Sequence, residues 1–382
     1  MDFGLTEKQL NLKNNVRKFC KQEFNADLAF DLDRKEEFPM DLYRKAAKKG
    51  FPSLFIPGEY GGGGQGYLAV CLAMEEMCRA DSSLGLACMI GTFGSDLILL
   101  YGTEEQKNRY LPPLCRGDSI SAAAFTEPKS GTDITTLDTK ATKQGDEWRI
   151  NGIKTFITNA PIADFITVLC QTGSRVKPRK SQTLFIVDKE APGLKVTKLS
   201  NKMGIRCITT GEVAFKNVKV NDNNMLGEQN KGFSYSIDFF TISRTAIAAQ
   251  AVGTAQGALE IALKYAKQRK SAGQAIIRFQ QIGAKLAQLA TEIEAARLLT
   301  YKAACSIDQN NADPMLTSMA KLYSSSVAVQ AADVAIQTLG GYGYHGEYRV
   351  ERFYRDAKVT EIYEGTSEIQ RLAILKQLIK SS

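Results

Sequence analysis

The stretch EWRINGIKTFIT, residues 147–158, sets the middle of this chain apart from its two ends. It is rich in Trp, Ile, Phe and Thr, which favour β-strands. Three similar runs follow, DFITVLC (164–170), QTLFIVD (182–188) and GEVAFKNVKV (211–220), with Gly, Asn, Asp and Pro between them. The sequence therefore predicts a β domain over residues 119–229.

The segments on either side have the patterns of helices. In residues 1–118, Thr6 and Gln9 form a possible capping box before an apolar face, and Gly50 ends a helix that begins near Met40. After residue 230 come AQGALEIALKYAKQRK (255–270) and GAKLAQLATEIEAARLLTYKAA (283–304). The order predicts an α+β protein with helical domains at 1–118 and 230–382 around the β domain.

Composition excludes several classes of protein. The chain has 382 residues, 44% hydrophobic and 24% charged, as in an ordinary globular protein. Its net charge of +8 is spread along the sequence, which favours an anionic ligand weakly, and no basic helix face or motif indicates nucleic acid. His345 is the only histidine, so Ser-His-Asp triads and multi-histidine metal sites are not expected. A base in this protein is expected to be a carboxylate.

Targeting signals are not apparent either. The sequence shows no signal peptide and no apolar run of 18 residues, so we expect a cytoplasmic protein without a membrane segment. Its eight cysteines form no C-x-x-C pair and are expected to be buried thiols. The motif G-x-G-x-x-G occurs at Gly61 and again at Gly341, but neither follows a predicted strand, so we interpret both as loop glycines.

Five segments in order resemble the acyl-CoA dehydrogenase flavoproteins. They are AFTEPKSGTD (124–133), NGIKTFITNA (151–160), YAKQRKSAGQAIIRFQ (265–280), QTLGGYGY (337–344) and RDAKVTEIYEGTSEIQRL (355–372). The resemblance covers nearly the whole chain. It implies an N-terminal helical domain, a central β-barrel domain and a C-terminal four-helix bundle, assembled as a homotetramer with FAD.

The resemblance also implies a role for Glu364 in the stretch IYEGTSEIQ, residues 362–370. The carboxylate would take the α-proton of an acyl-CoA thioester while a hydride leaves the β-carbon for flavin N5. Beside Tyr363 and shielded from water, such a base should be a stronger proton acceptor. Gly365 would let the backbone approach the ligand, and Ser367 and Gln370 look like a second capping box. The alternative is a solvated glutamate before a helix.

Cofactor and substrate positions follow from the same resemblance. Thr126 and the backbone around Phe125 and Gly131 would meet the isoalloxazine, as would Phe156 and Thr158. Thr132 would touch the acyl-CoA. The nucleotide half of FAD would be reached, partly across a subunit interface, by Arg269, Gln280, Gln337, Gly341, Thr366 and Glu368. Each could instead be a surface residue of the barrel rim or of a helix.

Some positions depart from the family pattern. Ala272 stands where a phenylalanine often follows the arginine motif, which removes an apolar contact with FAD. The CoA-holding motif L-D-x-x-R appears as FTISR (240–244), with Thr241 for the aspartate and Arg244 retained. Ser243 occupies the position where some relatives carry the base, which leaves Glu364 without a rival there. The segment 82–96 has no arginine, which argues against a dicarboxylyl substrate.

Asp96 lies in a segment that is generally uncharged or apolar in relatives, near the far end of the acyl pocket. One interpretation is a helix cap, because Ser95 or Asp96 precedes the apolar run LILLYG. The other is a pocket acid that binds a polar acyl group, or that accepts a proton from a cyclic acyl-CoA.

Three functions remain open from the sequence. The first is dehydrogenation of an acyl-CoA with electron-transfer flavoprotein as acceptor. The second is an oxygen-using oxidase or monooxygenase of the same fold. The third is a flavin-free binding protein, which the intact motifs disfavour. The length and branching of the acyl chain are not indicated.

Overall fold

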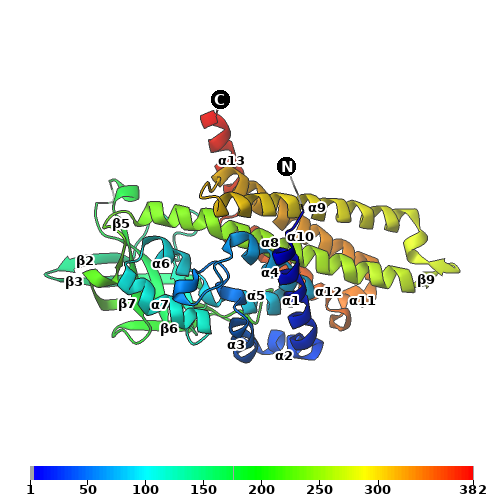
Figure 1. Cartoon of the computed structure of the whole chain (residues 1–382), viewed down its shortest axis with the longest axis horizontal. Coiled ribbons are helices and arrows are strands. Elements are labelled where there is room, and N and C mark those ends of the chain that lie inside the picture. The colour runs from blue at the N-terminus through cyan, green and yellow to red at the C-terminus, as the bar shows by residue number, and fades with distance from the viewer. Residues whose placement is uncertain (1–3, 175, 382) are drawn as a thin grey trace.

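The computed structural model describes residues 4–174 and 176–381, so the two outermost ends of the predicted domains (1–3 and 382) lie outside it. Its elements run in the order helices, strands, helices, which confirms the α+β class. In Figure 1 the β domain lies at one end, the N-terminal helices lie at the centre, and the long C-terminal helices run toward the other end.

The N-terminal part consists of seven α-helices among the described residues: α1 (Glu7–Glu23), α2 (Ala26–Lys35), α3 (Met40–Lys48), α4 (Gly66–Ala80), α5 (Ser82–Met89), α6 (Ser95–Tyr101) and α7 (Glu104–Arg116). The predicted capping box at Thr6 and Gln9 is confirmed at the start of α1. Gly50 has φ of 76° just after α3, a conformation that glycine adopts without the steric cost of a Cβ.

The middle part forms one eight-stranded sheet: β1 (Ser121–Ala124), β2 (Lys140–Gln144), β3 (Glu147–Thr158), β4 (Phe165–Gln171), β5 (Gln182–Asp188), β6 (Leu194–Lys198), β7 (Thr210–Asn221) and β8 (Met225–Leu226). The strand order is β6-β7-β3-β2-β4-β5-β8, with β1 paired to β4. Within the described residues no pairing joins β6 to β8, so the expected barrel is an open sheet by strand pairing. Its register along β3 and β7 breaks between Lys154 and Ile157.

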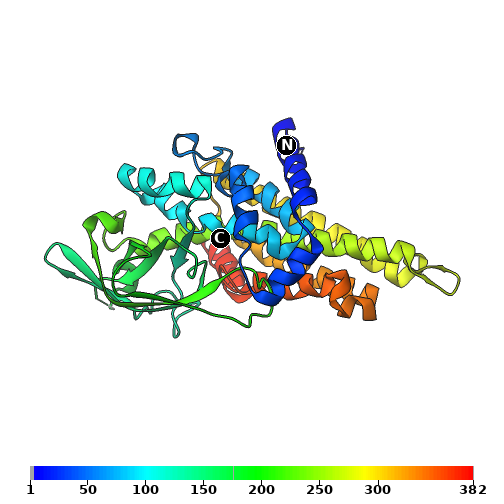
Figure 2. The ribbon, with the colours of Figure 1, turned by 90° about the horizontal axis from the view of Figure 1, so that it is seen from below.

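The C-terminal part is a bundle built on α8 (Gly232–Gln268), α9 (Gln280–Asp308) and α10 (Pro314–Leu339). A short hairpin of β9 (Lys270–Ser271) and β10 (Gln274–Ala275) joins α8 to α9, and α11 (Gly341–Tyr344), α12 (Val350–Lys358) and α13 (Ser367–Ser381) follow. Many of the residues buried along α8 and α10 are alanines, whose small side chains allow close helix packing. Figures 1 and 2 both show the α8–α9 hairpin at the end of the molecule opposite the β domain.

One stretch of 20 residues, Ser82–Tyr101, passes a length and composition test for a membrane span, although no apolar run of that kind was expected. The structure divides it into α5, a 3-10 turn (Ile90–Thr92) and α6, and most of it is buried. A core segment of a globular protein has these properties. Both G-x-G-x-x-G motifs lack a preceding strand, as predicted, and seven of the eight cysteines are buried free thiols.

A buried polar cluster joins the three parts of the chain. Arg352 of α12 pairs with Asp81, which also accepts a hydrogen bond from the Leu84 N–H at the start of α5. Asp356 of α12 accepts from the Ser83 hydroxyl at 2.8 Å and from the Ile205 N–H at 2.5 Å. Since α12 leads directly into residues 359–366, this cluster fixes the approach of the chain to Glu364.

Removing the charge of Arg352 should destabilise the protein strongly. Arg352→Met leaves Asp81 buried without its ionic partner, which typically costs about 3–5 kcal/mol of unfolding free energy. Chemical denaturation would measure the loss. The control is Lys219→Met, because Lys219 and Glu147 are 3.9 Å apart and both substantially exposed, so the change should stay below about 1 kcal/mol. Equal losses in the two variants would contradict this account of the cluster.

Candidate active site

Glu364 lies in the short loop between the 3-10 turn Val359–Glu361 and α13. Its backbone has φ of 53°, and Gly365 has φ of 90°, so two successive residues adopt the left-handed region. For a non-glycine residue this conformation costs of order 1 kcal/mol and persists only where neighbouring contacts impose it. The turn therefore depends on its supports.

Three side chains from other elements hold this turn. The Ser243 hydroxyl of α8 donates to Oε2 of Glu364. The Gln370 amide of α13 donates to the carbonyls of Glu364 (3.1 Å) and Gly365 (2.9 Å). Lys321 Nζ of α10 donates to the Gly365 carbonyl at 2.7 Å. Together they fix both the backbone and the carboxylate of Glu364.

The charges around Glu364 act in opposite directions. Burial raises the pKa of its carboxyl, whereas the Ser243 hydrogen bond and the positive charges of Arg244 and Lys321 lower it, and the net pKa is raised. A carboxylate of raised pKa is a better proton acceptor than an exposed one. The geometry therefore fits a general base and does not support the alternative of a solvated glutamate.

Arg244 has donor capacity left for a ligand. One of its terminal nitrogens donates to the Ser318 hydroxyl at 3.3 Å, while its buried Nε has no partner among the described residues. A guanidinium with a free donor suits an anionic or carbonyl-bearing ligand. Thr241 differs, since it is buried and its hydroxyl donates to the Ile237 carbonyl of the same helix. Its hydroxyl hydrogen is thus already used within α8.

The predicted second capping box is wrong by one residue. The Ile369 N–H donates to the Thr366 hydroxyl at 3.4 Å, whereas the Ser367 hydroxyl lies 3.5 Å from the Glu361 carbonyl. The Gln370 side chain binds the base turn instead of returning to a cap. The side chain of Thr366 therefore caps the start of α13. Glu368 is exposed in the first turn of this helix.

Asp96 does not cap α6, so the capping interpretation is wrong. The N-cap of α6 is Gly94, which makes no side-chain cap hydrogen bond, and Asp96 lies in the first turn. The Tyr67 hydroxyl of α4 donates to Oδ1 of Asp96 at 2.8 Å. Burial raises the pKa of Asp96 to about 6, and its charge acts on Glu364. These observations favour the pocket interpretation.

The Tyr67 hydrogen bond should set the charge of Asp96. Tyr67→Phe removes a donor that favours the carboxylate, so the pKa of Asp96 should rise above about 6. An aspartate in an unfolded chain titrates near 3.9, so the stability linked to Asp96 is present at low pH and is lost as pH rises through the folded pKa.

The pH dependence of the unfolding free energy, with Asp96→Asn as reference in each background, measures this shift. In Tyr67→Phe the loss should begin at the same low pH and extend to higher pH than in the parent. Identical curves in both backgrounds would contradict an effect of Tyr67 on Asp96.

One buried ion pair contacts the loop that carries the predicted flavin positions Phe125 and Thr126. Lys154 Nζ donates to the Phe125 carbonyl and to Oε1 of Glu127, both at 2.9 Å, and the other carboxylate oxygen of Glu127 accepts from the Asp138 N–H at 2.5 Å. This pair holds the loop after β1, where Phe125 is buried and Gly131 and Thr132 are exposed. Thr126 is partly exposed, as is Thr158 at the end of β3.

Phe156 is the clearest sign of a ligand surface at this place. It interrupts the register of β3 and β7, has φ of 57°, and is 70% exposed as a residue. An aromatic residue so exposed on a strand fits the planar ring of a flavin. The donor and acceptor groups of Thr126 and Thr158 lie in the same part of the domain, so the residues present fit the isoalloxazine of FAD.

The predicted nucleotide positions lie elsewhere in the chain. Arg269 directly follows α8 and Gln280 begins α9, so both flank the hairpin at the end opposite the β domain (Figures 1 and 2). Gln337 and Gly341 are exposed at the end of α10 and the start of α11. A Cβ at Gly341 would meet no atom within 4 Å, which leaves room for a ligand. One chain therefore does not bring these four residues to Phe156.

Several residues of the site were missed from the sequence. Lys321, Tyr67 and Lys154 come from helices or strands far from Glu364 in the chain, and single lysines or tyrosines on helices give no signal of their own. From the sequence, Ser243 indicated only that this position carries no second base. Its position next to Arg244, in the motif that matched the family, was the available signal.

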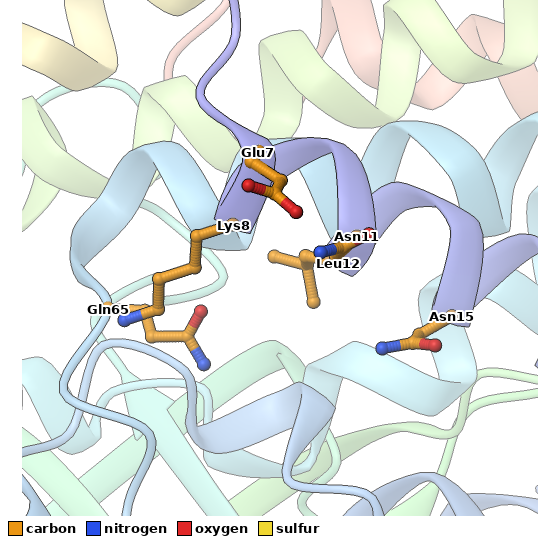
Figure 3. A pocket seen from close by; sticks show the side chains of 6 residues that line it. All are labelled: Glu7, Lys8, Asn11, Leu12, Asn15 and Gln65. Atoms are coloured by element: carbon orange, nitrogen blue, oxygen red, sulfur yellow. The ribbon is translucent and has the colours of Figure 1, made fainter.

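A surface hollow beside α1 is separate from this site. Figure 3 shows its lining side chains, Glu7, Lys8, Asn11, Leu12, Asn15 and Gln65. It contains none of the predicted site residues.

Family models match almost the whole chain. They are described as the acyl-CoA dehydrogenase N-terminal domain over residues 6–118, middle domain over 122–218 and C-terminal domain over 230–379.

Curated relatives and solved structures match over the same length. A 3-(aryl)acrylate reductase of Clostridium sporogenes is 41% identical over 98% of this chain and 99% of its own. The caffeyl-CoA reductase-Etf complex subunit CarC of Acetobacterium woodii is 39% identical over 98% of this chain and 99% of its own. The structure of butyryl-CoA dehydrogenase from Megasphaera elsdenii superimposes with a TM-score of 0.95 at 37% identity, covering 99% of this chain and 100% of that one.

Proposed function

We propose, from the premise that this chain belongs to the acyl-CoA dehydrogenase family of FAD-dependent oxidoreductases, that it interconverts an acyl-CoA thioester and its 2-enoyl-CoA with Glu364 as the base. The observation that carries this proposal is the partly buried carboxylate of Glu364, held in a left-handed turn by Ser243, Lys321 and Gln370.

Proton removal from the α-carbon is the step that the chain's own residues perform. An α-proton of a thioester is weakly acidic, so the base must be placed and kept ionised at working pH. Arg244 and Lys321 favour the ionised form, while burial makes it a strong acceptor. The Ser243 hydroxyl engages Oε2 of Glu364, so the other carboxylate oxygen, Oε1, can accept the proton while this hydrogen bond holds the side chain in place.

Bound FAD supplies the acceptor for the hydride that leaves the β-carbon. Phe156, Thr126, Thr158 and the backbone around Phe125 and Gly131 would hold its ring system, with Thr132 toward the acyl-CoA. Arg269, Gln280, Gln337 and Gly341 would hold its nucleotide half from a neighbouring subunit, since the hairpin between α8 and α9 and the helix α11 lie at the end of the molecule opposite the β domain. Thr366 and Glu368 would contact the same half.

This division of the FAD site supports a homo-oligomer, and we expect a tetramer. Figure 1 shows α13 projecting from the body of the molecule. Along it Leu372, Leu375, Leu378 and Ile379 are at least half exposed, which indicates a surface that another copy covers.

Electron-transfer flavoprotein is the proposed redox partner. The caffeyl-CoA reductase relative has an Etf complex in its printed name, which supports this partner. Because this relative and the 3-(aryl)acrylate reductase are both named as reductases, an assay in both directions is needed to determine the direction of the reaction. Oxygen uptake in the same assay would identify an oxygen-using enzyme instead.

Glu364→Gln is the test of the proposed base. The amide is nearly isosteric and cannot accept the α-proton, so flavin reduction by a saturated acyl-CoA should fall about 100-fold or more while FAD and thioester still bind. Anaerobic bleaching of the flavin absorbance measures it across thioesters of different chain length.

The control is Glu361→Gln, three residues away, whose carboxylate pairs with the exposed Lys358. Flavin reduction by the acyl-CoA in this control variant should proceed at the parent rate. A Glu364→Gln enzyme that reduces its flavin at the parent rate would refute the assignment, as would a parent that no thioester bleaches.

A second candidate activity uses Asp96 as an auxiliary acid or base on a cyclic or polar acyl group. The hydrogen bond from Tyr67 and the Coulomb effect of Asp96 on the pKa of Glu364 support this proposal, because such an effect is expected of two carboxylates that lie near each other. With a pKa near 6, Asp96 can be present in either protonation state near neutral pH.

Asp96→Asn separates this activity from a purely structural aspartate. As a pocket acid, the variant should keep FAD and folding while its turnover on cyclic or polar thioesters falls about tenfold or more relative to linear ones, within the range of general acid–base effects. Steady-state rates on linear, branched and cyclic thioesters measure the ratio. An unchanged ratio would eliminate the pocket role.

A further inference from the structure

Lys321 of α10 is the support of the base turn that carries a charge. Its side chain is fully buried, and within residues 4–174 and 176–381 the one hydrogen-bond acceptor recorded for Nζ is the Gly365 carbonyl at 2.7 Å. Gln370, a neutral amide, already donates to the same carbonyl at 2.9 Å. Holding the backbone therefore does not by itself require a buried ammonium.

A comparison with Lys154 shows what is unusual. Lys154 is also fully buried, and its charge meets Glu127 directly at 2.9 Å. Lys321 has no carboxylate oxygen of the described residues within ion-pair distance. Since a buried charge is retained only where an opposite charge compensates it, the charge that compensates Lys321 has to lie on the far side of the Glu364–Gly365 turn.

The groups that face this place identify the source of that compensation. From α8 come Ser243 and the cation Arg244, and from α6 comes Asp96; the remaining charged groups are Glu364 itself, Glu361 and Glu368, with Tyr363 adjacent. The pKa of Lys321 is lowered to about 8: burial is the largest cause and the charge of Arg244 acts in the same direction, while Glu364 is the carboxylate that opposes the lowering most.

We propose that Lys321 is a positioning residue for the base: its hydrogen bond fixes the Glu364–Gly365 turn, and its charge keeps the partly buried carboxylate of Glu364 ionised. The inference rests on the proposed role of Glu364. It adds that the base is a coupled pair in which α10 supplies the charge and the loop before α13 supplies the carboxylate.

Three substitutions separate the two contributions of Lys321. Lys321→Met removes the donor and the charge, Lys321→Gln removes the charge and keeps a shorter donor, and Lys321→Arg keeps both. Lys358→Met is the matched control, because Lys358 lies near the same loop but is about half exposed and pairs with Glu361.

The readout is the rate of flavin reduction by an acyl-CoA as a function of pH in the FAD-loaded protein. A base must be ionised, so the rate falls below its pKa. Loss of a nearby opposite charge raises the pKa of a carboxyl by about one unit or more. The acid limb of the pH–rate profile should therefore move up by at least about one pH unit in Lys321→Met and Lys321→Gln. At pH values below the limb, this shift corresponds to about a tenfold loss of rate. The limb should stay in place in Lys321→Arg and Lys358→Met.

The plateau rate at high pH reports the hydrogen bond. It should fall further in Lys321→Met than in Lys321→Gln. If Lys321→Met does not fold or does not retain FAD, the comparison of Lys321→Gln with Lys321→Arg decides by the position of the limb. A limb at the same pH in all three variants and the parent would overturn the proposal, as would an equal shift in Lys321→Arg and Lys321→Gln.

A second readout needs no catalysis. The folded pKa of Glu364 is raised, so the stability linked to this carboxyl is fully present below its unfolded pKa and is lost as pH rises through the folded pKa. Measured against Glu364→Gln in each background, that loss should extend about one pH unit higher in Lys321→Gln than in the parent. Identical curves would overturn the proposal. A parent protein whose flavin no thioester reduces would refute the dehydrogenase proposal, whereas these stability curves would still test Lys321.

Discussion

A carboxylate that must stay ionisable in a partly buried, left-handed turn is the constraint on which this site depends. Glu364 has φ of 53°, and burial disfavours its charge. Neither condition is stable alone. Side chains from three helices meet them: Ser243 and Arg244 from α8, Lys321 from α10 and Gln370 from α13. The bundle therefore serves as the frame that holds one base.

The remaining domains position that frame against a cofactor surface. Arg352 and Asp356 of α12 bind residues of the N-terminal helices and of the β domain, so the chain enters the base loop from a fixed direction. In the β domain the buried pair of Lys154 and Glu127 holds the loop that begins at Phe125. Phe156 remains exposed beside it. Buried polar contacts thus connect parts of the molecule that lie far apart in the sequence.

The sequence predicted those features that local patterns determine. The stretch 147–158 coincides with β3 because its residue types suit a pleated strand, and Thr6 and Gln9 form their capping box because that interaction spans only three residues. The base motif is likewise a short contiguous run. Local patterns also misled where two interpretations share one signal, as at Ser367, where Thr366 is an equally good cap one residue earlier.

Contacts between distant residues could not be predicted in this way. Asp96 precedes an apolar run as a helix cap would, and only the fold brings the Tyr67 hydroxyl of α4 to it. Lys321 lies 43 residues before Glu364, in a part of α10 outside the five segments that resemble the family. The strand order of the sheet, and therefore which strands lie at its open edges, also depends on pairings between strands far apart in the chain.

The central claim is that Glu364 removes the α-proton, and exchange with deuterated water tests it most directly. Phenylacetyl-CoA has α-hydrogens but no β-hydrogen to transfer, so proton removal can be observed without oxidation. By NMR in D₂O, the FAD-loaded protein should incorporate deuterium at the α-carbon, and Glu364→Gln should do so at least about 100-fold more slowly. Exchange at the same rate in both proteins would contradict the account.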